Sequence, residues 1–350
     1  MHILVDIRTE SPLDLIRLEY GRAWAKLWKE YHPHDILTFL VTEWVHIEEE
    51  SVIFVKKDRG FFTRRKIAHH EHGPDRIVSF SVFDPIDTHI PTITHVFDSA
   101  LVLYPRSEMN ILERKLLERR FLRTMQHSHD IIVPHIEIGM ELVEVFGIPE
   151  KKISVIPYFL PERVHHPFAH LHLYGVTAWY WITEWSRGDE WNPFTLLQVY
   201  ARYIHEFNGT KRLIITGDLG DNMRHISECI RGLGILDYVK IIGILPPADR
   251  ACLYEYASGW ISVGSYYSAW PSITMALSYW LPTLVADIAP IRDFSDLTIH
   301  PNHTNELIDK LLIFTKLSVS SEKYTESQHS VVEVYGRVIA ESTCKRYKVL

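Results

Sequence analysis

A short segment after the strand predicted over residues 259–263 has side chains and backbone groups that suit an anion. Pro271 and Ser272 open a predicted helix there, and Ile273 and Thr274 follow in its first turns. The start of a helix leaves backbone N–H groups unpaired, and the helix dipole favours negative charge at that end. We therefore predict a phosphate-binding site formed by the amides of residues 272–274 and the hydroxyls of Ser272 and Thr274.

A purely structural interpretation of the same helix remains open. Serine is a common first residue of helices, so Ser272 simply caps the helix in this alternative. Ile273, Met275, Ala276 and Leu277 then fill a hydrophobic core. The order of elements along the rest of the chain helps to choose between a phosphate site and a purely structural helix start.

Short β-branched runs alternate with longer segments of helical period, which predicts the α/β class with parallel sheets covered by helices. In the first half, strands are expected at 2–7, 36–41, 52–55, 76–80, 93–97, 130–133 and 153–156, and helices at 12–31, 107–127 and 137–147. In the second half, strands are expected at 174–182, 212–216, 238–242, 259–263 and 283–286, and helices at 193–207, 221–232, 247–257, 272–280 and 324–345.

The composition is that of a globular protein large enough for two domains. The chain has 350 residues, 46% of them hydrophobic, and no uncharged apolar window reaches the length of about 18 residues that a membrane span needs. A net charge of -7 gives no general attraction for nucleic acid. The few, widely spaced cysteines argue against a disulfide framework, and the start of the chain reads as a strand rather than a signal peptide. We therefore expect a cytoplasmic protein.

Several segments, taken in order, resemble one large family of enzymes. In the second half these are "RLIITGD" (212–218), "IRGLGILDYVKIIGILPPADRACLYEYASGWISVGSY" (230–266) and "MALSYWLPTLVADIAPIRDF" (275–294); in the first half, "ILVDIR" (3–8), "THVFDSALVLYPR" (94–106) and "FGIPEKKISVIP" (146–157). Their order and spacing resemble the GT-B glycosyltransferases of the retaining group called family four. The resemblance spans nearly the whole chain.

The resemblance implies a GT-B fold, in which two Rossmann-like domains face each other across a cleft. Residues 1–165 would form the acceptor-side domain, residues 170–325 the nucleotide-sugar domain, and residues 326–350 a helix crossing back to the first. The implied reaction transfers a hexose, with retention, from a nucleotide-diphosphate sugar to a glycan or lipid-linked acceptor, as in polysaccharide biosynthesis. No metal or other cofactor is implied, since protein donors hold the leaving diphosphate.

Individual residues take roles from the resemblance. Arg187 and the segment 272–274 would hold the diphosphate, and Gly217 would leave space beside the nucleotide. Tyr267 would contact the donor sugar.

In the first domain, Asp98 would act in catalysis and Arg17 would face the acceptor. His95 lies close to the position where the family has histidine. Its alternation along the strand suggests that its side chain points elsewhere.

The chain also departs from the family pattern at chemically important positions. Two glutamates that members carry eight positions apart are Tyr267 and Met275 here, and Trp191 stands where members have lysine. A second function class therefore stays open: a catalytically degenerate GT-B subunit that binds a partner glycosyltransferase or a glycan. A sugar-nucleotide epimerase is disfavoured, because residues 264–286 contain no carboxylate or basic side chain.

The segment 110–125 combines five basic residues with a leucine-rich face. It predicts either a helix that rests on anionic lipid at the inner face of the membrane or an ordinary surface helix, and Glu113 and Glu118 favour the second.

Tryptophans also stand near turns where glycine would suit a positive φ angle, at Trp191, Trp270 and Trp280. The chain has ten tryptophans and only 16 glycines. One hypothesis is a source that reads UGA codons as glycine, so that some of these tryptophans are glycine in the natural protein.

Overall fold

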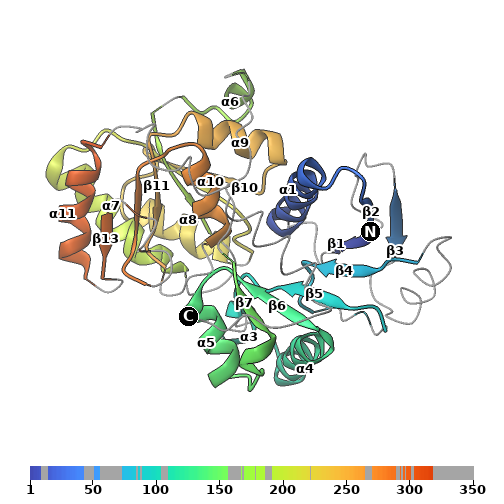
Figure 1. Cartoon of the computed structure of the whole chain (residues 1–350). Helices are drawn as coiled ribbons and strands as arrows, with labels where there is room; N and C mark the ends of the chain where they lie inside the picture. The colour runs from blue at the N-terminus through green and yellow to red at the C-terminus, as the bar shows by residue number, and fades with distance from the viewer. Residues whose placement is uncertain are drawn as a thin grey trace. The chain divides into compact units, whose positions relative to one another are not determined.

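The computed structural model describes most of the chain: residues 1–8, 15–42, 51–55, 73–83, 86, 89–103, 109–156, 167, 169–177, 179–185, 191–220, 222–264, 270–288, 292, 295, 297–300 and 303–317. These residues belong to two compact units, the first made of 1–103 and 109–156 and the second of 167–317. Each unit contains one parallel sheet with helices around it (Figure 1). Arg187, Tyr267 and the helix expected at 326–350 lie outside the described residues. Among the described helices, none has the length and apolarity to cross a bilayer.

The sheet of the first unit has seven strands in the order β3-β2-β1-β4-β5-β6-β7. The strands are β1 (His2–Asp6), β2 (Ile36–Thr42), β3 (Val52–Val55), β4 (Arg76–Ser79), β5 (Thr92–His95), β6 (Asp130–Val133) and β7 (Ile153–Val155). All neighbouring pairs are parallel. The seven strands predicted from the sequence are confirmed, each end within two residues.

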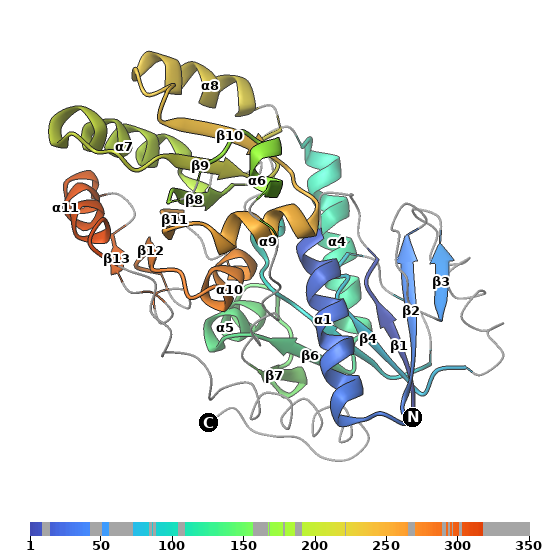
Figure 2. The same cartoon turned by 90° about the horizontal axis from the view of Figure 1, so that it is seen from above.

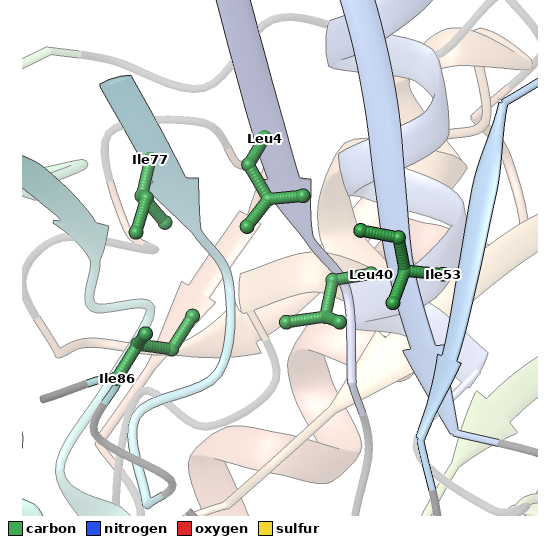
Figure 3. Packing of buried hydrophobic residues seen from close by; sticks show 5 residues of the cluster. All are labelled: Leu4, Leu40, Ile53, Ile77 and Ile86. Carbon is green, nitrogen blue, oxygen red and sulfur yellow. The ribbon is translucent and has the colours of Figure 1, made fainter. Parts of the chain in front are cut away.

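The register of these strands brings apolar side chains together on one face of the sheet. Leu4 of β1 lies opposite Ile77 of β4, and Leu40 of β2 lies opposite Ile53 of β3. Partners in a parallel ladder point to the same face, so these four side chains form one cluster, which Ile86 completes (Figure 3). Because helices cover both faces of such a sheet, its strands read as continuous apolar runs.

The helices of the first unit are α1 (Leu15–Tyr31), α3 (Ala100–Leu103), α4 (Ile111–His127), α5 (Ile136–Glu144) and the 3-10 turn η1 (Glu150–Lys152). Helix α1 lies unusually close to the sheet at Gly21. A Cβ atom at that position would come within 2.3 Å of Ile7 Cγ2. Glycine there lets α1 pack its Trp24 against Phe80 at the end of β4.

The sheet of the second unit has six parallel strands in the order β10-β9-β8-β11-β12-β13. They are β8 (Trp181–Glu184), β9 (Leu213–Thr216), β10 (Val239–Gly243), β11 (Gly259–Ser262), β12 (Thr283–Ala286) and β13 (Leu297–Ile299); the helices are α6 (Ala169–Leu173), α7 (Pro193–Phe207), α8 (Asn222–Gly232), α9 (Pro247–Glu255), α10 (Trp270–Ser278) and α11 (Thr304–Phe314). Trp181 packs against Tyr200 of α7 and Phe314 of α11 on one face. Helices α9 and α10 cover the other face (Figure 2).

The strand expected at 174–182 is wrong, because β8 begins only at Trp181. Gly175 and Trp179 both adopt positive φ angles, which interrupt an extended chain. The backbone N–H groups of Tyr174 and Val176 instead donate to the carbonyl of Leu171 and close the end of α6. Elements α3, α6, α11 and β13 were not predicted.

Trp280 occupies the position that usually belongs to glycine at the end of a helix. Its φ angle is 57°. Its N–H donates to the carbonyl of Leu277, and the N–H of Leu281 donates to that of Ala276, the paired pattern of a Schellman motif. The positive φ expected at Trp280 is confirmed, whereas Trp191 and Trp270 are not among the residues with positive φ.

Replacing Trp280 with glycine should therefore relieve backbone strain. An L-residue in the left-handed region is less stable there by about 1 kcal/mol or more. We expect Trp280→Gly to unfold with a free energy about 1 kcal/mol higher than Trp280→Ala, which loses the same indole but keeps Cβ. Urea denaturation of the two variants measures the difference, and equal stabilities would argue against strain at this position.

The same geometry supports the hypothesis of recoded codons. Mass spectrometry of the natural protein tests it directly: glycine at position 280 would support the hypothesis, and tryptophan there would end it.

Candidate functional site

The strand order of the second unit identifies one place where its sheet can hold a ligand. From β8 the chain proceeds to β9 and β10 on one side, and then crosses to β11 on the other side of β8. The connections after β8 and β11 therefore leave in opposite directions, and open α/β sheets bind ligands outside the carboxyl ends of such strands. In this unit the edge is formed by the ends of β8 and β11.

Two helices begin at this edge, one after each strand. Helix α7 follows β8 and starts at Pro193, after Asn192; helix α10 follows β11 and starts at Trp270. The side-chain amide of Asn192 donates to the carbonyl of Val263, just past β11, at 3.5 Å. This hydrogen bond holds the start of α7 next to the end of β11. Since β11 leads into α10, both helices begin at the same edge of the sheet.

The structure separates the roles expected of residues 272–274. Because α10 starts at Trp270, helix geometry leaves the N–H of Ser272 among the unpaired amides, whereas those of Ile273 and Thr274 fall within the helical ladder. All three side chains are buried. The amide of Ser272 thus remains suited to an anion, and Ile273 belongs to the core as in the purely structural interpretation.

Gly217 directly follows β9 and has a φ angle of 101°. A Cβ atom there would lie 2.0 Å from the carbonyl oxygen of Trp185, which follows β8. Glycine is therefore required by the approach of two backbone segments. Its role beside a nucleotide stays a prediction.

Two buried indole groups at this edge carry unused hydrogen-bond donors. Trp185 follows β8 and Trp191 precedes α7, and both side chains are buried. Neither indole N–H finds an acceptor among the described residues. Since buried polar groups are normally paired, these donors suit a ligand rich in oxygen atoms.

A charged cluster lies beneath the same edge. Glu184, the last residue of β8, accepts a 2.9 Å hydrogen bond from the hydroxyl of Tyr254, and its carboxylate lies 3.8 Å from the Arg250 guanidinium. Tyr254 and Arg250 both belong to α9, and all three side chains are buried. Burial, followed by the charge of Glu184, raises the pKa of Tyr254, so its hydroxyl stays protonated and donates to the carboxylate.

Removing this donor should lower stability more than removing a donor to neutral groups. We expect Tyr254→Phe to reduce the free energy of unfolding by about 2 kcal/mol, because a hydrogen bond to a buried charge is lost. The control is Tyr200→Phe, whose hydroxyl donates to the backbone carbonyls of Lys211 and Tyr238; there we expect about 1 kcal/mol. Urea denaturation compares the two, and equal losses would contradict a charge-assisted bond.

The first unit has a corresponding edge, between β1 and β4. Arg8 forms a two-point ion pair with Asp6, with Nε and Nη2 at 2.7 and 2.9 Å from the two carboxylate oxygens. Ser79 at the end of β4 donates to the same carboxylate at 2.8 Å. All three side chains are buried, so the carboxylate is satisfied inside the protein.

Arg17 and Asp98 approach this edge from two different elements. Arg17 lies in the first turn of α1, with its guanidinium 6.0 Å from the centre of the Phe83 ring. Asp98 is half-buried just after β5, next to Phe97. Tyr20, one turn after Arg17, packs edge-on against Phe97 at 5.2 Å. The structure therefore places Arg17 beside Phe83, and Asp98 next to an aromatic cluster that includes Tyr20, Phe80 and Phe97, and the roles of both residues stay predictions.

His95 lies inside that aromatic cluster and not on its surface. Its ring stacks on Phe80 with centroids 4.4 Å apart, and it is buried. Burial lowers the pKa of His95 to about 3, so the imidazole is neutral at physiological pH. The prediction that its side chain points away from the position of the family histidine is consistent with this packing.

The low pKa of His95 makes the first unit sensitive to acid. An unfolded histidine binds a proton near pH 6.5, whereas the folded one does so only near pH 3, so stability is present above pH 6.5 and falls as pH is lowered. Between pH 7 and pH 5 this group alone should account for a loss of about 2 kcal/mol.

The matched variant is His95→Phe, which keeps an aromatic ring against Phe80. Its unfolding free energy should lose about 2 kcal/mol less than that of the unsubstituted protein between pH 7 and pH 5, measured by urea denaturation. Parallel pH curves for the two proteins would contradict the assignment.

Sequence reasoning missed the buried carboxylates Asp6 and Glu184. A signal for both was present, because each ends an apolar run that forms the first strand of its unit. Their partners are harder to recognise: Arg250 and Tyr254 lie about 70 residues from Glu184 on a helix of low amphipathic regularity. Only the fold brings them together.

Comparisons with known proteins agree with this architecture. No family model matches the chain, and no curated protein sequence matches it. Among solved structures, sucrose-phosphate synthase from Thermosynechococcus elongatus superposes with a TM-score of 0.66 at 12% identity, over 98% of this chain and 96% of that chain. HepE from Anabaena, in complex with UDP and glucose, gives 0.65 at 14% identity over 97% and 94%. UDP-GlcNAc 2-epimerase from Methanocaldococcus jannaschii gives 0.57 at 13% over 97% and 99%.

The two parallel sheets and these structural neighbours establish the fold class as GT-B, built from two Rossmann-like α/β units, as the sequence predicted. The neighbours include a lipopolysaccharide galactosyltransferase, a sucrose-phosphate synthase and an epimerase at similarly low identity. The likeness therefore establishes the fold, and the activity has to be argued from the residues of this chain.

Proposed function

We propose that the protein is a glycosyltransferase that takes a sugar from a nucleotide-diphosphate donor. The observation that carries the proposal is the edge of the second unit, where α7 and α10 both begin and where the buried indoles of Trp185 and Trp191 have N–H donors without an acceptor among the described residues. Helix N-termini favour phosphate, and the indole donors suit the oxygen atoms of a diphosphate or a sugar. HepE, whose structure holds UDP and glucose, shares this fold.

In this proposal the chain itself supplies the charge stabilisation. The amide of Ser272 and the guanidinium of Arg187 hold the diphosphate, where negative charge develops as the bond to the sugar breaks. The hydroxyl of Thr274 lies on the same helix, one turn after Trp270. Gly217 keeps the ends of β8 and β9 close together beneath the nucleotide. Tyr267 contacts the donor sugar. No metal or further cofactor is required for these contacts.

The first unit would receive the acceptor. Asp98 acts as the catalytic group on that side, and Arg17 orients the acceptor at the carboxyl edge. We propose a glycan or a lipid-linked sugar as acceptor, a retained anomeric configuration and a hexose as the transferred group. Reaction at the inner face of a membrane, with the protein itself in the cytoplasm, fits a lipid-linked acceptor.

A second candidate is a GT-B subunit that has lost catalysis and binds a partner glycosyltransferase or a glycan. The observation in its favour is the sequence of α10 and the segment before it, which has Tyr267 and Met275 where the resembling family has glutamates. Without these carboxylates the hydroxyl groups of a donor find fewer strong acceptors.

Calorimetry with the full chain distinguishes the candidates. We expect UDP or GDP, and the corresponding sugar nucleotides, to bind, and the bound donor to be hydrolysed slowly to the free sugar. Arg187→Gln should weaken nucleoside diphosphate binding about tenfold, because a charge-assisted contact to phosphate is lost.

The matched control is Arg202→Gln, which removes an exposed arginine paired with Glu206 on α7 and should leave the dissociation constant unchanged. If no nucleotide binds the folded protein, and a second glycosyltransferase co-purifies with it, the subunit candidate replaces the enzyme.

A further inference from the structure

The first turns of α4 expose aliphatic side chains to solvent in an unusual concentration. Ile111 is 73% exposed, Leu112 77% and Leu116 56%. Single exposed aliphatic residues are common on protein surfaces and need no explanation. Leu112 and Leu116 are neighbours one turn apart, and Ile111 lies about 100° around the helix from Leu112, so the three form an interrupted apolar patch.

Three basic residues of α4 lie on the same side as this patch. At about 100° per residue, an arc of about 140° that starts at Ile111 contains the patch, Lys115, Arg119 and Arg123, and also Gln126 and the half-buried Leu122. These three cations are exposed. We call the patch and these cations the outward arc of α4: Ile111, Leu112, Lys115, Leu116, Arg119 and Arg123. The buried residues Leu117, Phe121, Thr124 and Met125 point to the opposite side.

The two glutamates of α4 lie just outside the outward arc. By the same helical spacing, Glu113 projects about 60° beyond Leu116 at one end and Glu118 about 20° beyond Ile111 at the other. The carboxylate of Glu113 also accepts the backbone N–H of Asn110 at 2.9 Å, and the side chain of Asn110 accepts the N–H of Glu113 in return. Glu113 is therefore engaged in capping the helix.

The other two arginines of α4 are held by backbone carbonyls. Arg114 donates to Met109 at 3.1 Å, and Arg120 donates to Phe83 at 2.8 Å. The outward arc thus combines three aliphatic side chains, three cations and no acid. This is the composition of a helix that lies in the interface of an anionic membrane, where apolar groups enter the acyl boundary and cations contact the headgroups.

We propose that the outward arc of α4 docks the protein onto an anionic lipid surface. Charge complementarity selects this occupant: the chain as a whole carries a net charge of -7, yet the arc is wholly basic and apolar. Each cation near an anionic surface strengthens binding about fivefold, and the aliphatic groups add binding that does not depend on charge. The proposal goes beyond sugar transfer and does not rest on it.

Flotation of the full chain with vesicles tests the proposal. Binding is expected to vesicles of phosphatidylcholine mixed with phosphatidylglycerol and not to phosphatidylcholine alone, and it should weaken as salt is added. Binding to both vesicle types alike, or to neither, would overturn the proposal. Capture of an acidic protein through the outward arc, with no binding to vesicles, would overturn it as well.

Variants locate the contact. The triple variant Lys115→Gln/Arg119→Gln/Arg123→Gln should lower partitioning about 100-fold, and Leu112→Ser/Leu116→Ser about tenfold. The matched control, Arg224→Gln/Arg231→Gln/Lys316→Gln, removes the same charge from exposed positions of the second unit and should retain vesicle binding.

Far-ultraviolet circular dichroism and unfolding midpoints should be the same for all variants, because the substituted side chains are exposed. Equal loss of vesicle binding in the control and in the outward-arc variant would contradict a specific surface. Since nucleotide binding is measured separately, failure of docking and failure of the proposed transfer are distinguishable.

Discussion

The crossing of the chain from one side of the first strand to the other is the constraint on which both units depend. In the first unit the crossing separates β1 from β4, and in the second it separates β8 from β11. Because parallel strands require right-handed crossover connections, the two connections at such a point leave in opposite directions and leave the strand ends uncovered. The residues at these two uncovered strand ends must be stable when buried and must also leave room for a ligand.

Both units have the same pair of residue types at these strand ends, a carboxylate and an arginine. The first strand of each ends in a buried carboxylate, Asp6 or Glu184, and an arginine of the same unit lies beside it. A buried carboxylate without partners would be costly, and its negative charge would oppose an anionic ligand. With Arg8 and Ser79 in one unit, and Arg250 and Tyr254 in the other, the charge is satisfied within the protein. The strand end is thereby close to neutral and does not oppose an anionic ligand nearby.

The sequence predicted the repetitive part of this architecture and missed what depends on single residues. All seven strands of the first unit are recognisable, because a strand buried on both faces is a continuous apolar run. The strand expected at 174–182 failed at Trp179, since nothing local signals a left-handed tryptophan. Likewise, β13 and α11 follow a loop whose composition gives no periodic pattern. The candidate site at α10 was predicted from the strand and turn before it and stays a prediction, whereas the Glu184 cluster arises from contacts about 70 residues apart, which no local pattern encodes.

The absence of carboxylates from the sequence of α10 determines how this unit would bind a nucleotide-sugar substrate. Sugar and ribose hydroxyls bind most strongly to charged acceptors, and the half-buried Met275 provides only a weak one. The groups that remain at this edge are mainly donors: the Ser272 amide and the indoles of Trp185 and Trp191. Donors recognise phosphate oxygen better than they discriminate one sugar from another. A site of this composition would therefore derive most of its affinity from the diphosphate rather than from the sugar.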